Sequence, residues 1–118
     1  MNGQREVCLV DPTKPAHPTL VVSTTTNGTQ LQGDSCEPVI SADGTKVAFT
    51  ISAPGLYSNP YRQVVRKDLL TGRLEIITTS PTAIFANGDS SEPTINADGS
   101  VIAFTSQAPT LGTLVASV

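Results

Sequence analysis

Large and small apolar residues alternate along several short runs of the chain. The run "KVAFTIS" places Val47, Phe49 and Ile51 on one face of an extended strand. Ala48 and Thr50 fall on the opposite face. Large side chains on one side and small ones on the other suit a sheet that is packed on both faces, because its neighbours must interdigitate. A sheet with one face in water would carry polar residues there. The pattern therefore predicts short, buried β-strands.

This run belongs to a phrase that the chain contains twice. Residues 33–50 read "GDSCEPVISADGTKVAFT", and residues 88–105 read "GDSSEPTINADGSVIAFT", which is 55 residues later with 12 of 18 positions identical. Each phrase predicts a β-hairpin. "EPVIS" is the first strand, Asp43 and Gly44 supply the turn, and "KVAFTIS" is the second strand. An internal repeat of about this period is typical of arrays and propellers.

A second kind of hairpin lies between the phrases. "QVVRKDLLTGRLEIITTS" reads as strand, turn and strand, and "EVCLVDP" with "TLVVSTT" is a looser echo of it near the start of the chain. The repeating unit therefore has four strands, two from each hairpin. We divide the chain into a half unit at 1–32, a full unit at 33–80, and a half unit at 81–118 in which "TLVASV" begins a further strand.

These motifs resemble a known repeat. "EPTINADGSVIAFTS" and "VVRKDLLTGRLEIIT" look like the TolB-type, WD-repeat-like β-propeller repeat, whose blade carries Pro, Ser-x-Asp-Gly, a strand ending in Phe, and Asp-x-x-Thr-Gly. The resemblance covers most of residues 6–106, although Asn96 replaces the Ser and the loop "APGLYSNPYR" lengthens the unit. It implies an all-β fold of antiparallel four-stranded blades. It also implies a non-enzymatic binding or scaffold module that presents its loops to a protein partner, in an exported bacterial protein of the periplasm or cell surface.

The amount of sequence is too small for a whole propeller. The chain supplies about two blades, whereas propellers use four to eight, because the ring must close. Three explanations stay open at this point. The chain is a fragment of a longer polypeptide, a protomer that closes a ring with copies of itself (three chains making six blades), or a compact β-sandwich-like pair of sheets. The expected partner is accordingly another protein or a second copy of the chain.

Composition narrows the function classes. The net charge of −3 and the charged fraction of 14% argue against nucleic-acid binding, which usually needs a basic face. No apolar run reaches the length of a membrane-spanning helix, and the first ten residues lack the layout of a secretory signal, so we expect any signal to lie outside this sequence. Cys8 and Cys36 are too few for a disulfide framework, and Ser91 replaces Cys36 in the second phrase. Free thiols are favoured, with a disulfide as the alternative.

The acidic residues concentrate in the phrases. Two carboxylates at the start of each phrase, four in all, are expected on one rim, where they are weak candidates for a Ca²⁺ site or for contact with a basic partner: Asp34, Glu37, Asp89 and Glu92. The structural interpretation is favoured. Asp34 and Asp89 are expected to bond backbone N–H groups of their own loops, while Asp43 and Asp98 form turns. No resident cofactor is expected.

The basic residues gather on the second kind of hairpin. Four of them are weak candidates for docking on an acidic partner: Arg62, Arg66, Lys67 and Arg73. A solvated strand edge whose charges discourage strand addition is the favoured interpretation. The lone His17 is expected in a loop. Nucleophile elbows, phosphate-binding loops and His/Cys metal sets are missing from the sequence, so we predict no enzymatic activity. The alternative functions are an accessory structural subunit of a large, membrane-associated assembly, and a propeller fragment of a hydrolase.

Overall fold

The described part of the chain consists of β-strands and loops. The structure, a computed structural model, describes residues 4–16, 18–52, 61–78 and 88–108. Within these ranges there are eight strands and no helix: β1 (Cys8–Val10), β2 (Thr19–Val21), β3 (Ser35–Ile40), β4 (Lys46–Ile51), β5 (Gln63–Asp68), β6 (Leu74–Ile76), β7 (Ser90–Ile95) and β8 (Ile102–Ser106). All the strand pairs are antiparallel. The predicted all-β, antiparallel fold class is therefore confirmed.

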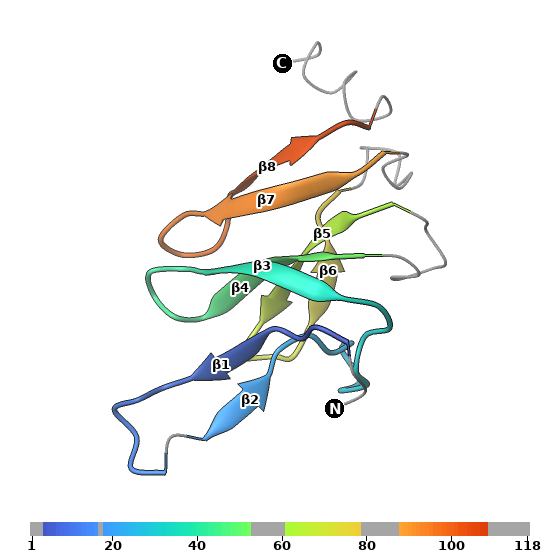
Figure 1. Ribbon diagram of the computed structural model, residues 1–118. Helices are drawn as coiled ribbons and strands as arrows, with labels where there is room; N and C mark the ends of the chain where they lie inside the picture. Colours follow the sequence, from blue (N-terminus) through green and yellow to red (C-terminus); the bar gives the residue numbers. More distant parts are fainter. Residues whose placement is uncertain (1–3, 17, 53–60, 79–87, 109–118) are drawn as a thin grey trace.

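The strands form three sheets that follow one another in space as they do in sequence. Their orders are β1–β2, β3–β4–β5–β6 and β7–β8, and Figure 1 shows the four-stranded sheet between the two hairpins. Strand β7 contacts β3, β4 and β5, so the third sheet lies against the second. The expected strand at "TLVASV", the loop residue His17 and most of "APGLYSNPYR" lie outside the described residues.

The core lies mainly between the first and second sheets. Strand β4 is buried from Val47 to Ile51, as the alternation of large and small residues predicts for a strand covered on both faces. Its large side chains join a cluster that draws on both sheets: Val7, Val22, Leu31, Val47, Phe49, Ile51 and Val65. Ala48 and Thr50, on the other face, are also buried. Burial of these apolar side chains is the main force that holds the sheets together.

A β-bulge explains why the phrase repeats Glu-Pro and Phe together. The register of β3 on β4 shifts between Cys36 and Val39, so that Glu37-Pro38 lies opposite the single residue Phe49. The same shift in β7 places Glu92-Pro93 opposite Phe104. Each glutamate has a left-handed backbone, with φ of 56° and 57°. A proline is tolerated in a strand at such a bulge, because the ladder is already interrupted there.

Aspartates stabilise the turns, as the sequence predicts. Asp43 accepts hydrogen bonds from the Ser41 hydroxyl at 2.7 Å and from the Thr45 N–H at 3.0 Å. These bonds, led by the one from Ser41, lower the pKa of Asp43 to about 2. Asp98 accepts the equivalent bond from the Ser100 N–H at 3.0 Å, and its pKa is lowered chiefly by a hydrogen bond from the Ser100 side chain and secondarily by this backbone bond. A short polar side chain that bonds the backbone two residues ahead fixes the hairpin turn.

Candidate functional site

The two repeated aspartates at the start of the phrases join one sheet to the preceding one. Asp34 Oδ1 accepts a hydrogen bond from the Arg5 N–H at 2.8 Å, and Asp89 Oδ1 accepts one from the Arg62 N–H at 2.9 Å. The N–H of the next residue, Ser35 or Ser90, donates back to the carbonyl of the same arginine at 2.9 Å. The prediction that these aspartates bond backbone N–H groups of their own loops is therefore wrong. The N–H groups that they bond belong to the arginines just before β1 and β5.

Three of the carboxylates proposed as Ca²⁺ ligands make separate hydrogen bonds with backbone N–H groups. Glu37 Oε1 accepts a hydrogen bond from the Glu92 N–H at 3.2 Å, which links equivalent positions of the two phrases. Asp34 and Asp89 each accept a backbone hydrogen bond from the preceding hairpin. Among the described residues, no three His, Cys, Asp or Glu side chains converge in a way that could hold a metal ion. The contacts that the structure gives three of these carboxylates are thus structural.

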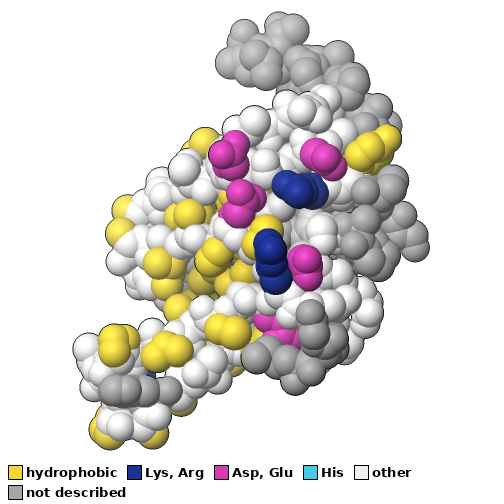
Figure 2. Space-filling model, viewed as in Figure 1, with side chains coloured by type: hydrophobic (Ala, Val, Ile, Leu, Met, Phe, Trp, Pro, Cys, Tyr) yellow, Lys and Arg dark blue, Asp and Glu magenta, His cyan; other side chains and the backbone are white. Residues whose placement is uncertain are grey.

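One polar cavity lies where strands β3 and β5 begin and strand β4 ends. It has a volume of about 230 Å³ and is lined by Arg5, Asp34, Cys36, Glu37, Thr50, Ser52 and Arg62. Figure 2 shows acidic and basic side chains interspersed on the half of this face where β3, β5 and β7 begin. Two arginines and two carboxylates give the lining both signs of charge. We call these seven residues the polar cavity.

Two side chains of the polar cavity, Thr50 and Cys36, were not predicted from the sequence as site residues. The hydroxyl of Thr50 is buried and has no hydrogen-bond partner in the part of the chain described. Cys36 is a free thiol whose pKa is raised, chiefly by burial and secondarily by the Glu37 carboxylate. A raised pKa keeps the thiol protonated and unreactive at neutral pH. Cys8, also a free thiol, is exposed. Neither cysteine is in a disulfide, as the sequence favoured.

The adjacent basic residues of β5 point to opposite faces of the central sheet, as successive strand residues must. The Lys67 ammonium donates to the carbonyls of Thr24, Thr25 and Gly72 at 3.2, 3.0 and 2.8 Å. Arg66 forms an ion pair with Glu75 and donates to the Gly99 carbonyl at 2.8 Å. Lys67 therefore ties β5 to the chain after β2, and Arg66 ties it to the turn between β7 and β8.

The four basic candidates accordingly occupy different environments. Lys67 is only 7% exposed, and its burial lowers its pKa. The side chain of Arg66 is also largely covered, whereas Arg62 and Arg73 are exposed. Arg62 lines the polar cavity, and Arg73 does not. Of the four, Arg62 alone is both exposed and part of the polar cavity.

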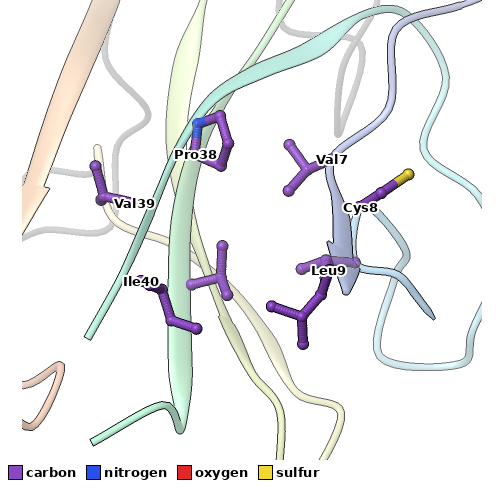
Figure 3. A pocket seen from close by; sticks show the side chains of 8 residues that line it. Val7, Cys8, Leu9, Pro38, Val39 and Ile40 are labelled. Atoms are coloured by element: carbon purple, nitrogen blue, oxygen red, sulfur yellow. The ribbon is translucent and has the colours of Figure 1, made fainter. Parts of the chain in front are cut away.

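A second, apolar cavity of about 180 Å³ lies between the first and second sheets. It is lined by Val7, Cys8, Leu9, Val22, Pro38, Val39, Ile40 and Val47. Figure 3 shows Pro38 and Ile40 of β3 pointing towards Val7 and Leu9. Because its walls are aliphatic, the cavity suits an apolar side chain rather than a polar ligand.

The chain has no significant match among known protein families, characterised proteins or solved structures. No helix in the described ranges is long and apolar enough to cross a membrane. The site is therefore interpreted from its own geometry.

Proposed function

We propose that this chain is a non-enzymatic binding or scaffold module built from propeller-type blades, and that it presents the polar cavity and its adjoining loops to a protein partner. The observation that carries this proposal is the recurrence of the same inter-sheet links. Asp34 bonds the preceding hairpin at Arg5, and Asp89 does so at Arg62. Links repeated at equivalent positions support a stack of like sheets with like loop faces, which is how propellers are built.

The composition of the polar cavity supports a protein as the ligand. Arg5 and Arg62 are exposed, and Asp34 and Glu37 lie beside them. Exposed guanidinium and carboxylate groups recognise peptide carboxylates, backbone groups and basic side chains. Arginine is also among the residues enriched at interfaces between proteins. A loop face held by a rigid sheet is where binding residues usually occur.

The test is capture of a partner by matched charge-reversal variants. The immobilised chain is exposed to an extract of cells that carry its gene, alongside Arg62→Glu and Arg73→Glu. Both arginines are exposed, but only Arg62 lines the polar cavity. We expect one protein to be captured by the wild type and by Arg73→Glu, and at least tenfold less by Arg62→Glu. Equal capture by all three, or no specific capture, would contradict the proposal.

A second candidate, an accessory structural subunit covered by other chains, has an observation of its own. Five apolar residues in the strands or the turns between them are about half exposed or more: Val10 (47%), Leu20 (53%), Ile40 (48%), Leu70 (78%) and Val101 (61%). Exposed apolar surface of this kind is typical of a protein that is covered in its working state. This candidate predicts that the chain unfolds at low denaturant alone and is stabilised by its neighbours.

A further inference from the structure

Because the phrase is repeated, equivalent positions of β3 and β7 can be compared. A preceding hairpin, β3–β4, covers β7, and no such hairpin is described before β3. Strand β7 lies against β3 and β4, and its Pro93 is buried. The equivalent Pro38 of β3 is exposed, and Ile40 is 48% exposed, whereas its counterpart Ile95 is partly covered. The face of β3 that corresponds to the covered face of β7 therefore lacks a hairpin among the described residues.

The glycines of the two turns give the same result independently. Gly99 is buried, and a Cβ placed on it would lie 2.6 Å from the Cδ of Lys46 in the hairpin before. Gly44, at the equivalent position, is exposed and has nothing within 4 Å of its Cβ direction. The residue equivalent to Lys46 in the second phrase is Val101, which is 61% exposed. A hairpin that placed its Val101 beside the Gly44 of another copy would cover both residues, as Lys46 and Gly99 cover each other within one chain.

Two strand edges lack a partner strand among the described residues, and the two are complementary. Strand β4 pairs with β5 along its whole length, from Lys46–Asp68 to Ile51–Gln63. The equivalent edges are the outer edge of β8 and the edge of β1 that faces away from β2, and no strand in the described ranges pairs with either. Cys8 on β1 is exposed, while its counterpart Val65 on β5 is fully buried. One chain thus presents both a hairpin and the edge that such a hairpin covers.

We propose that the β7–β8 hairpin of one copy pairs with the edge of β1 in a second copy and lies over its β3, so that β1 of the second copy takes the place beside β8 where the sequence predicts a strand at "TLVASV". This proposal rests on the proposed scaffold function and names a second copy of the chain as a partner. The β4–β5 register, in which Ala48 lies opposite Arg66, transfers directly to the new pair. It places Ala103 opposite Leu9 of the second copy. The strand pair would bury apolar residues that are exposed in the single chain.

The surface beneath the docked hairpin fits this geometry. Ala48 and Thr50 are the small residues on the face of β4 that is turned away from its large ones, and both are buried. Their counterparts Ala103 and Thr105 are exposed. In the second copy they lie over the apolar wall formed by Pro38 and Ile40, which Figure 3 shows beside β1. Small side chains allow the sheets to approach closely, as they do between β4 and β7.

A backbone link of the turns also repeats. The Asp43 N–H donates to the Ala97 carbonyl at 2.9 Å, from the first phrase to the second. The same bond between copies would run from the Asp98 N–H of one to the Ala42 carbonyl of the other. The contact is head-to-tail, so it closes into a ring when the rotation per copy allows and otherwise extends as a filament. Three copies would supply six blades, within the usual range.

The test is a cysteine pair placed by the transferred register. Leu9→Cys and Ala103→Cys are combined with Cys8→Ser and Cys36→Ser. Directly opposed Cα atoms in an antiparallel pair are about 4.5–5.5 Å apart, which a disulfide can bridge. The matched control carries Ala103→Cys with Cys36→Ser and keeps the native Cys8 and Leu9. Its β1 thiol is therefore at position 8 instead of 9, one residue away and on the opposite face of the strand. Both are oxidised with oxidised glutathione and analysed by non-reducing electrophoresis and mass.

We expect disulfide-linked multimers in most of the protein that carries Leu9→Cys with Ala103→Cys, and at least tenfold less in the control. Circular dichroism before oxidation shows whether both variants are folded. Folded variants that remain monomeric, or that cross-link equally, overturn the proposal. Light scattering of the wild type is a second measurement, since a monomer at all accessible concentrations also overturns it. These readouts concern self-association alone, so they fail or succeed separately from capture of a partner by Arg62.

Discussion

The strained glutamates of the bulges allow the cost of a backbone conformation to be measured twice in one molecule. Glu37 and Glu92 have φ of 56° and 57°, a region that costs an L-residue roughly 1–2 kcal/mol. Glycine adopts it freely but loses about 0.5–1 kcal/mol more conformational entropy on folding. We therefore expect Glu92→Gly to stabilise the single chain by about 0.5–1 kcal/mol.

Glu37→Gly is the matched comparison, because it changes the same position of the other phrase. Among the described residues, the two glutamates differ in one side-chain bond: the Glu37 carboxylate accepts a 3.2 Å hydrogen bond from the Glu92 N–H. An exposed hydrogen bond of this kind contributes about 0.5–1.5 kcal/mol. The relief of strain and the lost bond should nearly cancel, so Glu37→Gly is expected to lie within about 0.5 kcal/mol of the wild type.

The assay is urea unfolding followed by circular dichroism, at a protein concentration where the chain is monomeric. A difference of about 1 kcal/mol between the two variants corresponds to roughly 0.3–1 M in the urea midpoint for a small protein. Glu92→Ala serves as a control that removes the carboxylate and keeps the strain, and it should be close to neutral. If Glu92→Gly is instead less stable than Glu92→Ala, the left-handed bulge does not carry the strain assigned to it.

Two further predictions follow from the turns. Hydrogen bonds lower the pKa of Asp43 to about 2 from an ordinary 3.8, so its contribution is complete above pH 3.8 and is lost as the pH falls through about 2; Asp43→Asn should reduce the acid dependence seen in urea unfolding at pH 2–5, and an unchanged dependence would contradict the assignment. Gly44→Ala should cost about 1 kcal/mol from its positive φ alone, whereas Gly99→Ala should cost about 2 kcal/mol more, because its Cβ would meet Lys46; equal losses would mean that the turns do not pack as described.

The sequence predicted the strands better than the contacts between sheets. The alternation around Phe49 is local, and two-sided burial of β4 follows from it. The bulge could not be read in the same way, because Glu37-Pro38 in sequence looks only like the beginning of a strand. Its position depends on the register against Phe49, which is set by a neighbouring strand.

The candidate site was predicted less well than the fold. Arg66 and Lys67 form one basic cluster in the sequence, yet they point to opposite faces of β5, where Arg66 bonds the β7–β8 turn and Lys67 bonds the chain after β2. Arg5 belongs to the polar cavity but carries no motif. Its proximity to Arg62 depends on how the first and second sheets stack, which no local pattern encodes.

The way in which Asp34 and Asp89 are used has a consequence for how such a chain changes in length. Each carboxylate accepts a hydrogen bond from a backbone N–H of the preceding unit, and it requires no particular side chain there. A duplicated unit would carry its own aspartate, and the unit before it would already have the backbone N–H that this aspartate bonds. This bond sets no limit on how many units can follow one another. The number of consecutive units is therefore limited by the curvature that they accumulate and not by the bond that joins them.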